Sequence, residues 1–319
     1  MFTHYFHFYC RSAASRRRAA LLERLLARAD ASMPVTDWRA DAFRIIAPGD
    51  ISMPGVGAAA VHAEFGAVSG ATVMVATPVH YLAEMSNVRL AGDGILSLRQ
   101  GEADTLAAEF NRVWQGAGIR LLAGPRAELF GIAEQPLPVS THDPEDVRGQ
   151  HIERYLPSGE YAPRLRQLMS EIEMWLFEHA VNRTRVAAGT PAAGTPAAGR
   201  PAPGTPAISG LWLWGTGPAL QSLPQVTGWT AGDDLLFNSF APRRGAQPAG
   251  SGVVASAAQP GTDEWHALES HWLDSSLADL RAGRIGRIEL SAGKRCFSLS
   301  RSGARRFWRR SRPWWESFA

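Results

Sequence analysis

The stretch LPSGEYAPRLRQLMSEIEMWLFEHAVNRTR, residues 156–185, followed at residues 208–218 by ISGLWLWGTGP, decides the fold of this chain. Plotted at 100° per residue, its apolar residues gather on one helical face, while Met174 and Phe177 lie on the far side. Apolar residues on two sides predict a helix over about 161–180 that is central and buried between layers. The principal face holds Leu165, Leu168, Met169, Ile172, Leu176 and His179.

Short apolar runs alternate with helical patterns along the rest of the chain. Thr72–Ala76 predicts a buried strand, and residues 208–214 predict another that leads into Gly215-Thr216-Gly217. Near the C-terminus, Arg287–Ser300 predicts a hairpin that turns at Ala292-Gly293. The order of these elements predicts an α/β fold, either mixed α/β or α+β, with one principal sheet.

Composition divides the chain into parts. Residues 187–206 repeat Ala-Ala-Gly-Thr-Pro, carry almost no charge and have nothing to bury, which is typical of a disordered segment. We expect a flexible basic arm at 1–18, one globular α/β domain made of 19–186 and 207–315, a Pro/Ala/Gly-rich disordered insertion at 187–206, and a flexible loop at 243–262.

The net charge of +3 conceals two basic ends on an acidic body, because residues 1–30 and 284–319 are rich in arginine. Arginines interleaved with the tryptophans of residues 308–315 are typical of proteins that bind single-stranded nucleic acid or a membrane surface. Lys294 is the only lysine, however, so the arginine content partly reflects GC-rich codons. We therefore expect these tryptophans to close the core and the arginines to pair with the acidic body, with nucleic acid not a partner.

Cysteine and histidine usage limits the chemistry. Cys10 and Cys296 are too few for a disulfide framework or a zinc site, so a reducing cytoplasm is the expected location. The nine histidines show no H-E-x-x-H spacing, and neither metal nor cofactor is predicted. No run reaches the roughly 18 apolar residues of a membrane-spanning helix.

Three residues are candidates for catalysis. His80 follows a predicted strand, and strand ends in α/β folds tend to face ligand crevices. Glu171 belongs to a polar stripe with Glu178 and Asn182, and a carboxylate held at a raised pKa can transfer protons. His179 lies on the apolar face of the helix. For His179 the favoured alternative is a buried neutral histidine with a backbone partner, and for Glu171 it is an arginine partner. His80 is the better histidine candidate, although a lone histidine is weak evidence.

Other residues are candidates for ligand binding. Gly215 and Gly217 after a strand could cradle an anion with backbone N–H groups, but neither phosphate-loop motif is complete and Pro218 removes a donor. Asp233 and Asp234 could bind a cation, or could cap the following helix. The ligand-binding candidates are Trp175, Asn182, Trp212, Trp214, Gly215, Gly217, Asp233 and Asp234.

The chain resembles the proteobacterial family of RpfE-type regulatory proteins, whose members are also labelled predicted cofactor-independent phosphoglycerate mutases. The resemblance rests on four motifs, and Ser170 and Glu173 depart from the Asn and Gln expected in the second. These are Leu156-Pro157-Ser158-Gly159, Ser170-Glu171-Ile172-Glu173-Met174, His179-Ala180-Val181-Asn182-Arg183-Thr184-Arg185 and Trp212-Leu213-Trp214-Gly215-Thr216-Gly217, with Arg306-Phe307-Trp308-Arg309-Arg310 at the end.

The resemblance implies a non-catalytic regulatory protein of the bacterial cytoplasm that acts through a protein partner or a small ligand. The alternative is a phosphoglycerate mutase-like or phosphatase-like enzyme acting on phosphate esters. Resemblance to true cofactor-independent mutases would imply a nucleophilic serine and two divalent metals, and the sequence shows no Asp/His array of that kind. The regulatory reading is therefore the one we expect.

Overall fold

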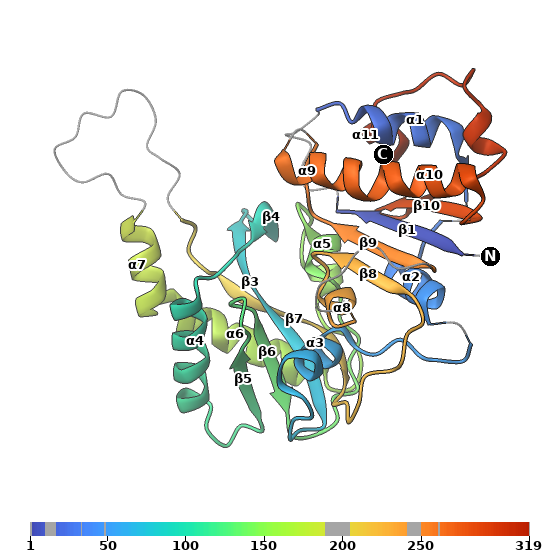
Figure 1. Ribbon diagram of the computed structural model, residues 1–319. Helices are drawn as coiled ribbons and strands as arrows, with labels where there is room; N and C mark the ends of the chain where they lie inside the picture. Colours follow the sequence, from blue (N-terminus) through green and yellow to red (C-terminus); the bar gives the residue numbers. More distant parts are fainter. Residues whose placement is uncertain are drawn as a thin grey trace. The chain divides into compact units, whose positions relative to one another are not determined.

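The computed structural model describes residues 2–9, 17–32, 34–47, 49–188, 205–240, 250–260 and 262–318. The chain divides into two compact units, where the sequence indicated one domain (Figure 1). Unit 1 comprises Met1–Met53 and Pro224–Ala319, and unit 2 comprises Pro54–Leu223. The α/β class is confirmed, but the described strands form two sheets instead of one principal sheet.

Unit 1 is built on a six-stranded sheet with the order β2-β11-β10-β1-β9-β8. Strands β10, β1, β9 and β8 run parallel, and the hairpin partner β11 is antiparallel to β10, as predicted. The elements of this unit are β1 (Thr3–Phe8), α1 (Ala20–Arg28), β2 (Asp30–Ala31), α2 (Trp38–Ile46), β8 (Trp229–Gly232), α8 (Leu235–Asn238), β9 (Gly252–Ser256), α9 (Asp263–Ala267), a π-helical turn (Leu268–Leu273), α10 (Asp274–Ala282), β10 (Arg287–Ala292), β11 (Arg295–Ser300), a 3₁₀ turn (Gly303–Arg305) and α11 (Trp314–Phe318).

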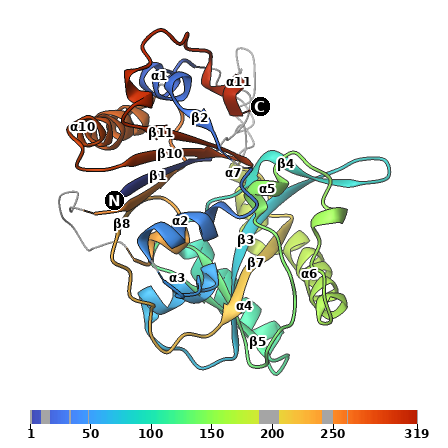
Figure 2. The same ribbon diagram turned by 90° about the vertical axis from the view of Figure 1, so that its right-hand side faces the viewer.

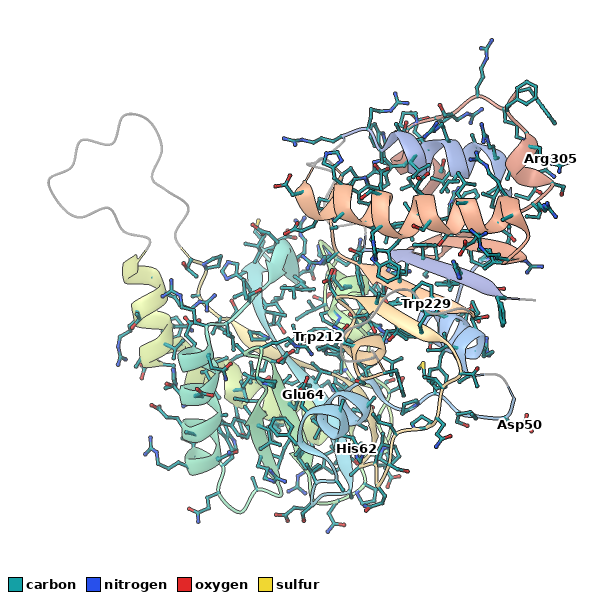
Figure 3. The ribbon with its side chains drawn as sticks, viewed as in Figure 1. Asp50, His62, Glu64, Trp212, Trp229 and Arg305 are labelled. Atoms are coloured by element: carbon teal, nitrogen blue, oxygen red, sulfur yellow. The ribbon has the colours of Figure 1, made fainter. Side chains whose placement is uncertain are left out.

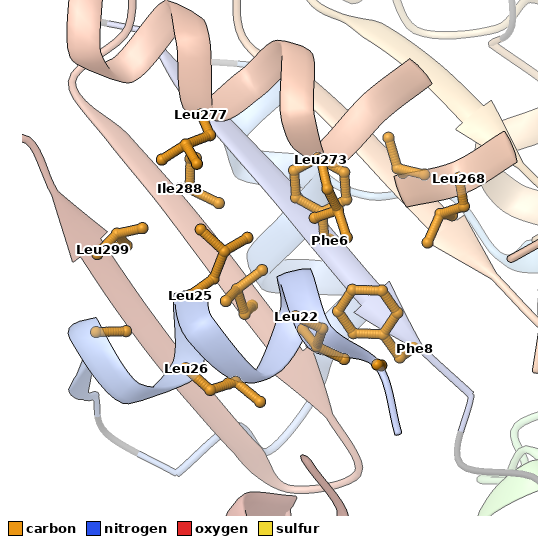
Figure 4. Close-up of a cluster of buried hydrophobic side chains, with 14 of the residues drawn as sticks. Phe6, Phe8, Leu22, Leu25, Leu26, Leu268, Leu273, Leu277, Ile288 and Leu299 are labelled. Carbon is orange, nitrogen blue, oxygen red and sulfur yellow. The ribbon is translucent and has the colours of Figure 1, made fainter. Parts of the chain in front are cut away.

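Helices cover both faces of this sheet, with α1 and α10 on one side and α2 and α8 on the other (Figure 1). Alternation along β1 sends Phe6 and Phe8 to the first face, where they join the leucines of α1 and α10 (Figure 4). Burial of this cluster supplies the main stabilisation of unit 1, since each fully buried large apolar side chain contributes about 1.5–3 kcal/mol. Its labelled members are Phe6, Phe8, Leu22, Leu25, Leu26, Leu268, Leu273, Leu277, Ile288 and Leu299.

Unit 2 contains an antiparallel sheet in which β3 is the shared strand, paired with β7, β6 and β4. Helix α3 packs on one face of β3 and β7, and α6 packs on the opposite face (Figure 2). Its elements are α3 (Val56–Phe65), β3 (Thr72–Ala83), β4 (Val88–Ile95), α4 (Gln100–Val113), β5 (Ile119–Ala123), β6 (Leu129–Ala133), α5 (Pro144–Val147), a 3₁₀ turn (Glu153–Tyr155), α6 (Ala162–Phe177), α7 (Ala180–Ala188) and β7 (Gly210–Pro218).

The predicted helix over 161–180 is observed as α6, but it is not buried between layers. Leu165, Met169 and Ile172 face the sheet, whereas Met174 is 69% exposed and Phe177 is 84% exposed. The far side of α6 therefore faces solvent, and its apolar residues mislead because a lone exposed Met or Phe needs no covering layer.

Two segments expected to be flexible contain central strands. Within the arm at 1–18, Thr3–Phe8 forms β1, and within the loop at 243–262, Gly252–Ser256 forms β9. Both strands are covered on both faces, so they lack the alternation of a surface strand, and the two buried histidines of β1 read as polar. Residues 10–16 of the arm, 189–204 of the insertion and 243–249 of the predicted loop lie outside the described residues.

Among the described residues, no helix is long and apolar enough to cross a membrane.

Histidines in β1 are buried in unit 1. His4 Nδ1 lies 2.8 Å from Ser276 Oγ, and His7 Nδ1 lies 3.1 Å from Ser291 Oγ. The His7 ring stacks on Trp38 with a centroid distance of 3.7 Å. Burial lowers the pKa of His4 and lowers that of His7 further, helped by the Arg39 charge. Both side chains are therefore neutral in the folded protein.

We predict that stability falls as the pH drops below about 6.5, the pKa of an unfolded histidine. Below that pH the unfolded chain binds protons that folded His4 and His7 do not, so stability is full above it and declines towards the lower folded values. Urea unfolding from pH 8 to pH 5 measures the slope, and His7→Gln, which cannot titrate, loses part of it. An unchanged slope in His7→Gln would contradict the prediction.

Close backbone contact joins α3 to β7. A Cβ at Gly217 would lie 2.8 Å from Gly55 Cα, and one at Gly57 would lie 2.6 Å from the Met74 carbonyl carbon. Gly215 adopts a φ of +62° and a Cβ there would lie 2.9 Å from Val56 Cβ. The glycines of Gly215-Thr216-Gly217 thus serve helix–strand packing.

We predict that Gly217→Ala destabilises unit 2 by about 1–3 kcal/mol, the typical cost of overpacking a closed contact. The matched control is Gly101→Ala on α4, where a Cβ meets nothing within 4 Å and alanine suits a helix. Thermal or urea unfolding compares the two variants, and equal effects would show that the Gly217 contact is not tight.

Candidate functional site

The carboxyl ends of three parallel strands in unit 1 meet at one edge of the sheet. Tyr9 follows β1, Asp233 follows β8, and Ser256 is the last residue of β9. Ligands of open α/β sheets bind outside the carboxyl ends of the strands, because loops and helix starts converge there. This edge therefore positions the side chains from which a site can be built.

A buried ion pair organises the edge. Arg39 Nε donates to Asp234 Oδ2 at 2.8 Å, and Tyr9 Oη donates to the same oxygen at 2.6 Å. The other oxygen, Oδ1, accepts from the N–H groups of Leu236 and Phe237 at 3.0 and 3.1 Å. Asp234 is 3% exposed and both its oxygens are occupied. It caps α8 and neutralises Arg39, so its role is structural.

Asp233 faces a different environment from its neighbour. Its Oδ2 accepts from the Ala257 N–H at 3.1 Å and from Ser256 Oγ at 3.4 Å. It borders a cavity of about 610 Å³ that also reaches the π-helical turn. The walls are Gly232, Asp233, Val254, Ser256, Ala257, Ala258, Glu264, Ala267, Leu268, His271 and Trp272.

The cavity is acidic and aromatic. Asp233 and Glu264 contribute carboxylates, and no lysine or arginine is found among the described residues of the walls. Trp272 stacks on Trp229 with a centroid distance of 5.0 Å, and His271 meets the Trp272 ring edge-on. Figure 3 labels Trp229 on β8. An indole face beside two carboxylates is a suitable environment for an organic cation.

A second cavity, of about 810 Å³, lies in unit 2 beside α6 and α7. It is lined mostly by apolar groups, with Glu173 and Tyr81 among its polar members. Burial raises the pKa of Glu173, and burial together with the Glu173 charge raises that of Tyr81. Asn182 also lines this cavity, but its side chain is occupied by backbone groups.

The three catalytic candidates all lie in unit 2 and have separate partners. His80 Nδ1 lies 2.9 Å from the Ala207 carbonyl oxygen. Glu171 accepts from Gln167 at 2.9 Å and from the Trp114 indole at 3.4 Å. The arginine partner expected for Glu171 is therefore replaced by an amide and an indole.

His179 is buried, and its Nε2 lies 3.1 Å from Glu109 Oε2. Burial lowers the pKa of His179, and the Glu109 charge only partly offsets this. Trp175 packs edge-on against His179 and Trp114, at centroid distances of 4.5 and 5.4 Å. These residues form an aromatic contact between α4 and α6 and not a reactive group.

The remaining ligand-binding candidates are held by the scaffold. Asn182 donates to the carbonyl oxygens of Leu176 and Ile208 and accepts from the Ile208 N–H, which fastens α7 to the start of β7. The indole of Trp212, labelled in Figure 3, donates to the His142 carbonyl oxygen at 2.8 Å, and that of Trp214 donates to Thr77 Oγ1 at 2.8 Å. Of the residues predicted to bind a ligand, only Asp233 borders the acidic cavity.

The part of the chain that the structure describes contains neither a cluster of metal ligands nor a reactive thiol. No group of three or more His, Cys, Asp or Glu side chains there is placed to hold a metal ion. The described residues therefore include no ligand set for the metal pair that a mutase-like mechanism would need. Cys296 is buried, and burial raises the pKa of its thiol to about 12, so it remains protonated.

Sequence reasoning missed most of the cavity. Ser256 ends a strand in a segment that was expected to be a flexible loop, and Glu264, His271 and Trp272 lie on helical turns without a recognisable motif. The π-helical turn that carries His271 and Trp272 is a rare conformation that is often found at functional sites. Its hydrogen-bond pattern leaves no signal in the sequence.

No family model matches the chain, and no curated protein matches its sequence. Among solved structures it is similar to a cofactor-independent phosphoglycerate mutase from Thermoplasma acidophilum DSM 1728, with a TM-score of 0.37, 12% identity, and 94% of this chain and 89% of that chain covered. It is also similar to the PH0037 protein from Pyrococcus horikoshii, with a TM-score of 0.42, 12% identity, and coverage of 94% and 87%. At these scores neither likeness identifies the function.

We predict opposite outcomes for two adjacent aspartates. Asp234→Asn leaves buried Arg39 without its counter-charge and is expected to cost about 3–5 kcal/mol. Asp233→Asn keeps an oxygen for the Ala257 N–H and is expected to change stability by less than about 1 kcal/mol. Urea unfolding of both variants makes the comparison, and a loss in Asp233→Asn as large as that in Asp234→Asn would contradict the assignment of roles.

Proposed function

We propose that this chain is a non-catalytic, RpfE-type regulatory protein that binds a small organic cation in the acidic cavity of unit 1. The observation that carries the proposal is the pairing of two carboxylates with an indole in a cavity of about 610 Å³ at the carboxyl edge of a parallel sheet. That volume is within the range of about 300–1,000 Å³ that is usual for small-molecule sites.

The charges at this edge favour a cation over a phosphate ester. The guanidinium of Arg39, on α2, forms an ion pair with Asp234, and its central carbon lies 4.7 Å from the centre of the Trp38 ring. It is therefore not free to receive a phosphate. An anionic ester in the cavity would instead face the exposed carboxylates of Asp233 and Glu264, whose like charge disfavours it.

The resemblance to RpfE-type proteins supports a regulatory role, and its motifs support the scaffold of unit 2. Asn182 and Arg185 of the helix motif fasten α7: Arg185 pairs with Glu102 at 2.9 Å and donates to the Pro206 carbonyl oxygen. Residues that maintain a fold while offering no reactive group suit a protein that senses a ligand. The bacterial cytoplasm remains the expected location.

Thermal unfolding with a panel of ligands tests the proposal. We predict that agmatine, spermidine or tetraethylammonium raises the melting temperature, because a ligand at 100 times its dissociation constant adds about 2.7 kcal/mol. 3-Phosphoglycerate, with or without Mn²⁺, is expected to give no shift and no turnover.

Matched variants locate the site. Glu264→Gln removes a wall charge and should weaken the shift, whereas Asp263→Asn removes an exposed charge one residue away, outside the walls, and should retain it. Loss of the shift in Trp272→Ala would support the indole contact. Turnover of 3-phosphoglycerate that is lost in Asp233→Asn would overturn the proposal in favour of the enzyme alternative.

A further inference from the structure

The segment between Gly303 and Trp314 is fixed at both ends and exposed in between. Gly303 and Ala304 are buried at its start. At its end Trp314 is buried, with its indole donating to the Arg17 carbonyl oxygen at 3.0 Å and its N–H to Glu23 Oε1 at 3.4 Å. Between these anchors, Arg306 and Arg309 tie the loop to the end of α1, where they donate to the carbonyl oxygens of Arg28 and Ala29.

Two aromatic side chains protrude from this loop. Phe307 is 80% exposed and Trp308 is 67% exposed. Their ring centroids lie 5.4 Å apart with an interplanar angle of 82°. Single exposed apolar residues are ordinary, but an adjacent Phe-Trp pair on a fixed loop forms a contiguous apolar surface of the kind that marks interaction sites.

Uncompensated positive charge surrounds the pair. Residues 301–312 contain six arginines and no acidic residue. Arg306 and Arg309 both reach the single carboxylate of Asp30. Arg305, which Figure 3 labels at the surface of unit 1, is exposed, as are Arg310 and Arg312, and these three have no acidic partner among the described residues. We call Arg305, Phe307, Trp308, Arg310 and Arg312 the C-terminal patch.

These contacts correct the expectation for the C-terminal end. Trp314 does enter the core of unit 1, and Arg306 and Arg309 do pair with an acidic residue. Trp308 does not close the core, and the arginines of the C-terminal patch are not neutralised within the described residues. The C-terminal stretch is rich in Arg and Trp throughout, but only its Trp314 end is buried and the residues before it are mostly exposed.

We propose that the C-terminal patch docks the protein on an anionic lipid bilayer. Trp and Phe partition to the boundary between headgroups and acyl chains, while flanking arginines attract anionic headgroups. Each basic residue close to such a surface strengthens binding by about fivefold. An exposed loop that projects aromatic and cationic groups together satisfies both requirements.

Single-stranded nucleic acid fits the patch less well. Sequence-independent binding of single strands needs several ring faces along a basic groove, on which successive bases stack. The C-terminal patch offers one pair of exposed rings that are nearly perpendicular. Its geometry therefore suits insertion into an interface better than a track of stacked bases.

Vesicle co-sedimentation with the full chain tests the proposal. We expect binding to vesicles of phosphatidylcholine with about one third phosphatidylglycerol, and little to pure phosphatidylcholine. Binding should weaken as NaCl rises from 50 to 300 mM, because salt screens exposed charges. Arg310→Gln combined with Arg312→Gln should reduce affinity about 25-fold at 50 mM NaCl, and Phe307→Ser combined with Trp308→Ser should reduce it at both salt concentrations.

Matched controls separate the patch from general charge and hydrophobicity. Phe177→Ser removes an equally exposed phenyl ring from unit 2, and Arg281→Gln removes an exposed arginine from α10. Both should bind anionic vesicles like the wild type. All the substituted side chains are exposed, so melting temperatures should remain within a few degrees of the wild-type value.

Three outcomes would overturn the proposal. One is the absence of binding to anionic vesicles at 50 mM NaCl. Another is binding that the Phe307/Trp308 and Arg310/Arg312 variants retain in full, which would place the contact elsewhere. The third is Trp308-dependent binding of a 20-nucleotide oligothymidylate in the absence of vesicle binding, which would assign the C-terminal patch to nucleic acid.

Discussion

Unit 1 depends on the pairing of β1 with strands that lie more than 240 residues away in the sequence. Thr3–Phe8 runs parallel between β9 and β10, with Tyr5 opposite Val253 on one side and Glu289 on the other. Such non-local parallel pairing requires the loop entropy of the whole intervening chain to be overcome. Unit 2 is inserted between the two halves of unit 1, so unit 1 assembles only when both ends of the chain are present.

The carboxyl edge of this sheet also depends on contacts between segments that are far apart in the sequence. Tyr9 extends β1, Arg39 comes from α2, and Asp234 begins α8, so three distant segments meet in one charged cluster. A buried pair of this kind contributes specificity more than net stability, because desolvation offsets much of the Coulomb attraction. The ion pair fixes the turn after β8. The conformation of this turn determines how Asp233 faces the cavity.

Local patterns predicted the elements that are stabilised locally. The hairpin over Arg287–Ser300 and the helix over residues 161–180 follow from alternation and from helical periodicity, and both are observed, the helix as α6. Patterns did not predict β1 and β9, because strands buried on both faces lack alternation and His4 and His7 read as polar. The cavity was missed for the same reason: Asp233 was recognised only as one of two adjacent acids on a turn before a helix, whereas Ser256 and Trp272 reach the cavity only through tertiary packing.

Four of the family-like motifs lie in unit 2, whereas the acidic cavity belongs to unit 1, which explains why those motifs say little about its chemistry. Asn182, Trp212 and Gly217 satisfy backbone groups or permit close packing in unit 2. Arginine is similarly uninformative where it is common, since 33 Lys and Arg residues include a single lysine. Its distribution is more telling: the described walls of the acidic cavity hold none, and the C-terminal patch holds three without acidic partners. Most arginines of this chain could reflect its compositional bias. A cavity wall without arginine and a cluster of arginines without acidic partners are therefore the two features that distinguish the proposed sites from the scaffold.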